Sequence, residues 1–275
     1  MIIDTHVHYN LEPLRSDWGT YWKHAQSVGV GKSIVIGTDS RTSKIAVEIA
    51  QQDNNVYASV GIHPNECADS SKNDLCMTAL KNLLDQDKHH KIVAVGECGL
   101  DYYRLPADQQ KHERIQQNQK MMFDLQITLA LQNDLPVIIH CRDTHENAYN
   151  DVLSILKVHP GTTFVLHCMS GSQQYLQEAL ALGGNISFAG NLTYKNAEAL
   201  RDLAKNTPKN RILLETDAPF LPPQSKRGQA NKPAFIMETA QELAKILGIS
   251  HQECEKLTSA NAERVFHLNE SMSIC

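Results

Sequence analysis

The chain alternates between short apolar runs and longer stretches that contain helical periodicity. Each apolar run is rich in branched residues and closes on polar residues or glycine, which is typical of a strand buried on both faces. Eight such runs occur, at residues 1–8, 33–39, 56–64, 92–101, 136–143, 163–171, 184–190 and 211–219. We therefore predict eight buried strands.

The segments between these runs are long enough for a helix and two turns. Residues 108–133 show the clearest helical periodicity, because Met122, Leu125 and Leu129 recur at helical spacing among polar residues. Eight strand–helix units without a GxGxxG motif favour a closed (β/α)8 TIM barrel over an open doubly wound sheet, with another α/β fold as the alternative. We expect one domain over residues 1–275, with C-terminal helices near 234–247, 250–257 and 259–267 packed on the barrel.

Composition and charge limit how this protein can bind its substrate and where in the cell it is expected. The net charge of −5 means that an anionic substrate has to be held by a local site rather than by bulk basic charge. No apolar run approaches the roughly 18 residues of a membrane span, and the first residues lack the features of a secretory signal, so we expect a cytoplasmic protein. Seven cysteines without a C-x-x-C spacing indicate reduced thiols.

Residue types that bind metals close several of the predicted strands. His6 and His8 lie two apart in the first run, so their side chains point to the same side. Further candidates at strand ends are Glu97, His140, His167 and Asp217. Each alone has an ordinary alternative, such as a salt bridge from Glu97 to Arg104 or a hydrogen-bonded barrel histidine. Because the carboxyl ends of barrel strands share one mouth, their repetition predicts a metal centre there.

Motifs throughout the chain resemble those of the TatD-like metal-dependent deoxyribonucleases of the amidohydrolase superfamily. They are DTHVH (4–8), VGIHP (60–64), GECGLDYY (96–103), LPVIIHCRD (135–143), HCMSG (167–171), ISFAGNLTYKNA (186–197), LLETDAPFLPP (213–223) and NAERVF (261–266). The resemblance covers nearly the whole chain and implies both a barrel fold and a hydrolytic activity.

The resemblance implies a centre of two divalent metal ions. The candidate ions are Zn²⁺, Mn²⁺ and Mg²⁺, and the sequence does not choose among them. His6, His8 and Asp217 look like ligands of one ion, His140 and His167 look like ligands of the other, and Glu97 looks like the bridge between them. Paired ions suit phosphodiester hydrolysis because they activate a water and neutralise charge on the reacting oxygens. Asp217 is then the expected general base. His63 is expected to bind phosphate or protonate the leaving oxygen, with a hydrogen bond inside the mouth as its alternative.

Substrate-binding residues are expected on the loops after the strands. Arg142 is a natural partner for a phosphate oxygen, and Lys195 and Arg227 are further cations, although each can also be an ordinary surface charge. Tyr102 and Tyr103 are candidates for stacking a nucleobase, with loop packing as the alternative.

The chain departs from the family pattern at two places near the expected substrate. Asn65 stands where members often have a histidine, and residues 227–231 read RGQAN where members often have RGKRN. The missing basic side chains weaken the case for tight nucleic-acid binding. Cys98, Cys141 and Cys168 each follow a proposed ligand, and strand alternation predicts that they face away from it and pack rather than bind metal.

These observations predict a hydrolase that cleaves DNA phosphodiester bonds, as an exonuclease on single-stranded ends. Its expected partner is DNA, bound transiently, with no membrane and no obligate protein partner. A first alternative is a small-molecule amidohydrolase or lactonase that uses the same ligands. Such relatives frequently carry a carboxylated lysine on strand four, where this chain has Glu97. A second alternative, a non-enzymatic binding protein, is disfavoured because every expected ligand is present.

Overall fold

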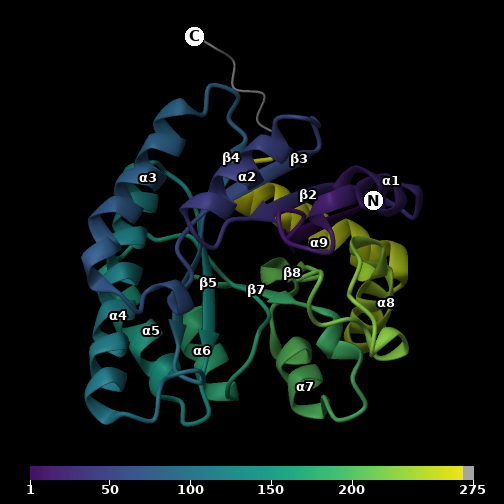
Figure 1. Cartoon of the computed structure of the whole chain (residues 1–275). Helices are drawn as coiled ribbons and strands as arrows, with labels where there is room; N and C mark the ends of the chain where they lie inside the picture. The colour runs from purple at the N-terminus through teal and green to yellow at the C-terminus, as the bar shows by residue number, and fades with distance from the viewer. Residues whose placement is uncertain (269–275) are drawn as a thin grey trace.

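The computed structural model describes residues 1–268 and shows a barrel of parallel strands (Figure 1). The strands follow one another around a single eight-stranded sheet in sequence order. They are β1 (Ile2–Val7), β2 (Val30–Ile36), β3 (Val56–Val60), β4 (Ile92–Asp101), β5 (Val137–Arg142), β6 (Phe164–Leu166), β7 (Asn185–Phe188) and β8 (Ile212–Leu214). Each lies within one of the eight apolar runs or overlaps it, so the predicted (β/α)8 barrel is confirmed.

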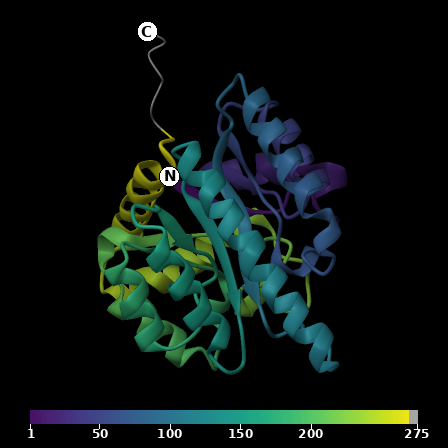
Figure 2. The same ribbon diagram turned by 90° about the vertical axis from the view of Figure 1, so that its left-hand side faces the viewer.

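An α-helix follows every strand, and a ninth closes the described part of the chain. The α-helices are α1 (Trp18–Ser27), α2 (Ser40–Ala50), α3 (Asn73–Gln86), α4 (Gln109–Gln132), α5 (Asn147–Val158), α6 (Gln173–Ala181), α7 (Glu198–Asn206), α8 (Ile236–Leu247) and α9 (His251–Phe266). Short 3₁₀ segments lie at η1 (Arg15–Asp17), η2 (Pro64–Glu66), η3 (Ser70–Lys72), η4 (Gly190–Thr193), η5 (Lys209–Arg211), η6 (Gln224–Lys226) and η7 (Pro233–Phe235). The helices form the outer layer around the strands (Figures 1 and 2).

Helix α4 matches its predicted span of 108–133 closely. Asp108 caps it by accepting a hydrogen bond from the backbone N–H of Lys111. Met122 and Leu129 are buried, as the periodicity predicts, whereas Leu125 is 37% exposed. No helix in residues 1–268 is both long enough and apolar enough to cross a membrane.

The barrel closes where β8 meets β1. Val7 forms a parallel bridge with Ala218, and the buried carboxylate of Asp4 accepts hydrogen bonds from the hydroxyl and the backbone N–H of Thr216. Burial raises the pKa of Asp4 to about 7, against the opposing effect of the Thr216 hydrogen bonds. These contacts fix the end of β8 beside the end of β1, which brings two groups of candidate ligands together.

The C-terminal segment differs from its prediction in one respect. Residues 250–257 and 259–267 were expected as separate helices, but α9 is continuous through this region. The polar residues there do not break the helix, because the hydroxyl of Thr258 donates to Cys254 O and that of Ser259 donates to Met1 O. Apolar residues of α9, including Phe266, pack with Ile3 and Leu213 of the strands. The helix therefore packs on the barrel as expected.

The domain predicted over residues 1–275 includes residues 269–275, which lie outside the described residues. The same is true of Cys275. The other cysteines, which are Cys67, Cys76, Cys98, Cys141, Cys168 and Cys254, are free thiols.

Candidate metal centre

The predicted metal ligands come from five strands and meet at the carboxyl end of the barrel. His6 lies in β1, Glu97 in β4 and His140 in β5. His8 directly follows β1, His167 directly follows β6, and Asp217 lies shortly after β8. The candidate ligands are buried except His140, whose side chain is 17% exposed. Parallel strands thus deliver these groups to one mouth, where active sites of such barrels lie.

A first group of donor atoms joins His6, His8 and Asp217. The Nε2 atoms of His6 and His8 are 3.3 Å apart. Oδ1 of Asp217 lies 3.3 Å from Nε2 of His8 and 3.6 Å from Nε2 of His6. Two ligands held at about 2.1 Å from a tetrahedral ion are themselves about 3.4 Å apart, so these atoms have the spacing of ligands to one cation. We call this group the His6–His8 position.

A second group joins His140, His167 and Glu97. Nδ1 of His140 and Nε2 of His167 are 3.3 Å apart, and Oε1 of Glu97 lies 2.9 Å from each of them. Nε2 of His63 lies 3.4 Å from the same carboxylate oxygen. This spacing also suits a single cation, and we call the group the His140–His167 position.

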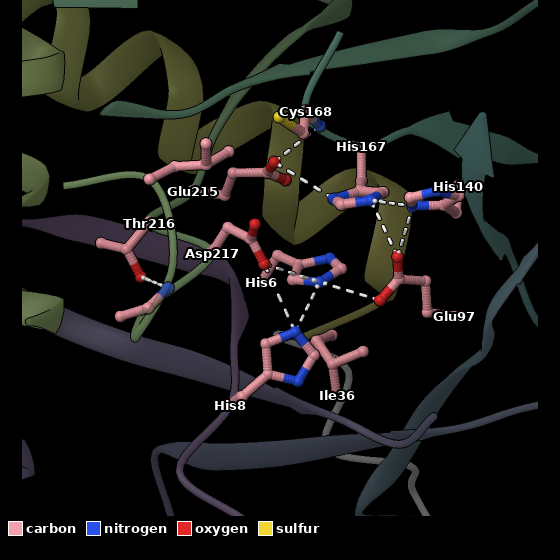
Figure 3. Close-up of polar contacts among 12 residues, drawn as sticks. His6, His8, Ile36, Glu97, His140, His167, Cys168, Glu215, Thr216 and Asp217 are labelled. Atoms are coloured by element: carbon pink, nitrogen blue, oxygen red, sulfur yellow. Dashed lines mark hydrogen bonds and ion pairs between the residues drawn. The ribbon is translucent and has the colours of Figure 1, made fainter. Parts of the chain in front are cut away.

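Glu97 spans the two positions (Figure 3). Its second oxygen, Oε2, lies 3.4 Å from Nε2 of His6, while Oε1 faces His140 and His167. Gly99, two residues later, allows β4 to run close beside β5, because a Cβ there would lie 2.1 Å from the carbonyl oxygen of His140. One carboxylate therefore offers one oxygen to each group of histidines.

The buried carboxylates of the centre carry negative charge that its histidines alone do not balance. The buried carboxylates of Glu97, Asp101, Glu215 and Asp217 form ion pairs only with histidines within residues 1–268. Buried carboxylates without strong cationic partners are costly. Metal ions held between the histidines and carboxylates would balance this negative charge, so the donor set fits the metals that the sequence predicts.

The pKa values of these groups show the same electrostatic pattern. Although burial acts to raise the pKa of Glu97, the neighbouring His167, His63 and His140 hold it well below the usual value. His8 and His6 likewise lower the pKa of Asp217 against the effect of burial. Burial lowers the pKa of His6 and His63. The carboxylates are thus ionised and the His6 imidazole is neutral near neutral pH, as metal ligands must be. At the other position, and against the effect of burial, Asp101 and Glu97 raise the pKa of His140, and Glu97 and Glu215 raise that of His167.

Comparison with known proteins identifies the family. The sequence profile described as TatD related DNase matches residues 3–267. The chain belongs to this TatD family. The Bacillus subtilis protein YabD, described as an uncharacterized metal-dependent hydrolase, is 34% identical over 98% of this chain and 100% of YabD. The 3′-5′ ssDNA/RNA exonuclease TatD of Erwinia tasmaniensis is 32% identical over 90% of this chain and 92% of that protein.

A solved structure supports the same relationship. The crystal structure of YjjV, a TatD homologue from Escherichia coli, superposes with a TM-score of 0.85 at 32% identity, covering 97% of this chain and 98% of YjjV. This TatD-family chain is therefore a member of a metal-dependent hydrolase family, and its groups of His and Glu side chains are suited to hold metal.

The centre opens into a cavity of about 720 Å³. His63 and Arg142 both line it. The imidazole of His63 lies next to the His140–His167 position, with 4.4 Å between its ring centre and that of His140. The exposed guanidinium of Arg142 stacks on the ring of Tyr103 at 4.0 Å. The structure therefore brings both of these predicted residues to the metal centre or its wall.

Tyr102 does not reach this cavity, which corrects the expectation that its ring faces the substrate. The side chain is 8% exposed, and its hydroxyl donates to Oδ2 of Asp151 on α5. Its neighbour Tyr103 is 53% exposed and stacks on Arg142 at the cavity wall. The two neighbouring tyrosines therefore point in opposite directions. Tyr102 points into the protein, where its hydroxyl has a hydrogen-bond partner, and Tyr103 points to the surface.

Lys195 and Arg227 lie on loops of the TatD barrel but are not among the residues that line the cavity. Lys195 is exposed, and its backbone N–H donates to the side chain of Gln224. Arg227 is also exposed, and its guanidinium stacks on the ring of Tyr194 at 4.8 Å. Both remain predictions as substrate-binding residues.

The cysteines beside the ligands differ among themselves. Cys98 is fully buried, as expected of a packing residue. Cys141 lines the cavity but also packs on the hydrophobic core against Tyr175, as expected, whereas Cys168 borders the cavity without such packing in the described part of the chain. The alternation fails at Cys168 because β6 ends at Leu166 and Cys168 has a left-handed backbone, with φ of 45°. No cysteine belongs to the groups that can hold a metal within the described residues.

Two buried carboxylates that were not among the predicted site residues lie behind the ligands. Oδ2 of Asp101 lies 3.4 Å from Nε2 of His140, and Oε1 of Glu215 lies 3.4 Å from Nδ1 of His167. A signal was present, because both are acidic residues that close an apolar run, at the end of IVAVGECGLD and after RILL. Phe220 was also not among the predicted site residues, and it lines the cavity, is 50% exposed and packs edge-on against His8.

Proposed function

We propose that this protein hydrolyses phosphodiester bonds at single-stranded DNA ends, using a centre of two divalent metal ions. The observation that carries the proposal is the spanning position of Glu97, whose two oxygens face separate groups of histidines. Two ions bound there would supply Lewis-acid charge and an activated water to a phosphate in the cavity. The Erwinia relative named as an ssDNA/RNA exonuclease supports nucleic acid as the substrate class.

The chain's own residues supply the remaining functions. Asp217 carries an ionised carboxylate next to His6 and His8, so it can accept a proton from the attacking water. Its backbone adopts a left-handed conformation, with φ of 54°, that places the carboxylate at the mouth. His63 is placed beside Glu97 at the other position, where its neutral ring can donate a hydrogen bond to an oxygen of the substrate phosphate.

Arg142 and the depth of the centre support an unpaired strand end as the substrate. The guanidinium of Arg142 lies at the cavity wall, where it can pair with non-bridging oxygens of a phosphate. The side chains of His6 and Glu97 are 0% and 5% exposed. A phosphate must therefore enter the barrel mouth to reach them, which an unpaired strand end can do more easily than the middle of a duplex.

A cleavage assay on metal-loaded protein tests this proposal. Single-stranded and double-stranded DNA, labelled separately at the 3′ and 5′ ends, would be incubated with Mn²⁺-loaded and chelator-treated enzyme beside matched RNA and a panel of small esters and lactones. We expect metal-dependent shortening of single-stranded DNA, faster than that of the duplex. Hydrolysis of an ester or lactone with no nucleic-acid cleavage would instead assign the centre to small molecules.

A further inference from the structure

The two metal positions differ in what lies behind their histidines. At the His140–His167 position, the ring nitrogen of each histidine that points away from the centre faces a carboxylate, Asp101 or Glu215, at 3.4 Å. The four outer nitrogens, including Nδ1 of His6 and Nδ1 of His8, are buried and have no hydrogen-bond partner within residues 1–268. At the His6–His8 position, however, the described residues place no ion-pairing carboxylate behind these nitrogens. Figure 3 shows the contact between Glu215 and His167.

This difference affects how well each histidine is prepared to bind a cation. A carboxylate beside the outer nitrogen keeps the proton there, leaves the inner nitrogen free as a ligand and makes it more basic. At 3.4 Å the contact is longer than a standard hydrogen bond, but its electrostatic effect is strong in a buried site. Within residues 1–268, neither His6 nor His8 forms such an ion pair at its outer nitrogen, although Glu215 also lies within 4.8 Å of a nitrogen of His6.

Asp101 is itself held firmly in place. Its Oδ1 accepts hydrogen bonds from the backbone N–H groups of Tyr103 and Arg104. Its Oδ2 accepts one from Nδ2 of Asn65 and faces His140. The residue is 1% exposed, so this carboxylate is fixed in the orientation that supports His140.

Glu215 carries a charge that little else compensates. It is fully buried, its Oε1 accepts a hydrogen bond from the backbone N–H of Cys168, and its Oε2 has no hydrogen-bond partner in the described chain. His167 is its ion-pair partner within residues 1–268. Because such a carboxylate is costly to bury, its place in the barrel makes sense if His167 holds a cation on its other side.

We propose that Asp101 and Glu215 are positioning residues that make the His140–His167 position the tighter of the two, so that it binds its ion first. Asp217 gives the His6–His8 position one direct carboxylate, but two carboxylates stand behind the other position, which also has His63 nearby. The ion at the His6–His8 position then binds second and exchanges more readily. The inference rests on the proposed two-ion centre but not on DNA as the substrate.

Calorimetric titration of the metal-free protein with Mn²⁺ alone tests the inference without any substrate. We expect wild type to bind two equivalents with distinct affinities. Asp101→Asn should weaken the tighter class by about 10- to 100-fold, because asparagine keeps one oxygen for the backbone hydrogen bonds but loses the charge and the acceptor at His140. Glu215→Gln should have a smaller effect. In Glu215 the same oxygen, Oε1, accepts from the backbone N–H of Cys168 and faces His167, so glutamine can keep an acceptor beside His167. The weaker class should change by less than about threefold in both.

Two further variants assign the classes and control for a general effect. His8→Ala should lose the weaker class and keep the tighter one. Asp53→Asn serves as the matched control, because Asp53 accepts a hydrogen bond from Trp22 outside the metal centre, and both classes should be unchanged in it. Circular dichroism would confirm that each variant is folded, and Asp101→Asn and Glu215→Gln test the inference independently of each other.

The outcomes separate this inference from the proposed function. Wild-type affinities in folded Asp101→Asn and Glu215→Gln, or loss of the tighter class in His8→Ala, would overturn the inference alone. A single Mn²⁺ equivalent in wild type would overturn the two-ion centre and the binding order with it. The expected binding pattern in a protein that cleaves no DNA would support the inference and reject only the proposed substrate.

Discussion

The metal ligands and the residues expected to hold the substrate are held in place by different parts of the fold. The ligands lie in strands or within a few residues of strand ends, and most are buried. Around the cavity, by contrast, Arg142, Tyr103 and Phe220 are exposed and are held by ring or cation–ring contacts. The metal centre is therefore fixed by the register of the sheet, while the rim can change without moving a ligand.

The two regions therefore determine different parts of the function, which are the type of reaction and the choice of substrate. Metal-dependent hydrolysis follows from the buried centre, whose donor atoms and spacing leave few alternatives. The choice of substrate depends on the exposed rim, which includes Arg142 and Phe220. Variants in the two regions should therefore fail in different ways, through kcat and metal content at the centre and through KM at the rim.

Glu97→Ala should have the largest effect, because it removes the one side chain shared by both positions. We expect hydrolysis to be abolished and bound metal to fall below two equivalents, as measured by initial rates and elemental analysis. Glu66→Ala is the matched control, since Glu66 lines the cavity but is exposed and outside both positions. Unchanged metal stoichiometry in Glu97→Ala would contradict the bridging role.

Asp217→Asn should separate proton transfer from metal binding within the centre. Asparagine keeps the size and one oxygen ligand but is a poor base, so kcat should fall by about 10²-fold or more with at least one ion still bound. Steady-state rates and metal analysis on the same preparation would check this. Near wild-type kcat at full metal occupancy would assign the proton to another group, with His63 as the next candidate.

Arg142→Ala should affect the rim alone. Loss of the phosphate partner is expected to raise KM for DNA by about 10-fold while metal content stays the same. Arg114→Ala, which removes an exposed arginine from the outer helix α4, is the control for a general loss of positive charge. If KM does not change in Arg142→Ala, the guanidinium does not hold the substrate.

The buried centre should also make the stability of the metal-free protein depend on pH. Burial opposes protonation of His167, but Glu97 and Glu215 hold its pKa well above 6.5, and Asp101 and Glu97 raise that of His140. The folded state thus keeps protons that the unfolded state releases. Their stabilising effect is complete below about pH 6.5 and is lost as pH rises through the folded pKa values.

Urea unfolding in the presence of a chelator would measure this dependence at pH values on either side of that window. The free energy of unfolding should fall as the pH rises above about 6.5 in the metal-free protein. The Mn²⁺-loaded protein should show no such fall, because protons no longer occupy the ligand nitrogens. Parallel pH dependence in the two forms would count against the proposed charge balance.

Tyr102→Phe should have the smallest effect on catalysis. It removes the hydrogen bond to Asp151 beneath the rim, so we expect a loss of about 1 kcal/mol in the free energy of unfolding and a KM within about twofold of wild type. Tyr103→Ala, its exposed neighbour, should instead raise KM by disturbing Arg142. Kinetics and chemical unfolding of both variants would show whether the two tyrosines differ as the structure indicates.

Much of this protein could be predicted from its sequence, because the relevant signals are local. Eight buried parallel strands require continuous apolar runs, and α4 requires helical periodicity, so both are visible along the chain. The candidate ligands were also visible, since His and acidic residues at strand ends must share one mouth in a closed barrel. Glu97 as the bridge and Asp217 as the base came only through the family resemblance.

Tertiary structure decided what depends on contacts between distant segments. The continuity of α9 across residues 257–259 depends on such contacts, because the hydroxyls of Thr258 and Ser259 bind backbone carbonyls. The importance of Asp101 and Glu215 depends on their lying against His140 and His167, which come from other strands. Which atom of a side chain faces which partner is set by packing and strand register across the barrel, and residue order along the chain does not contain that information.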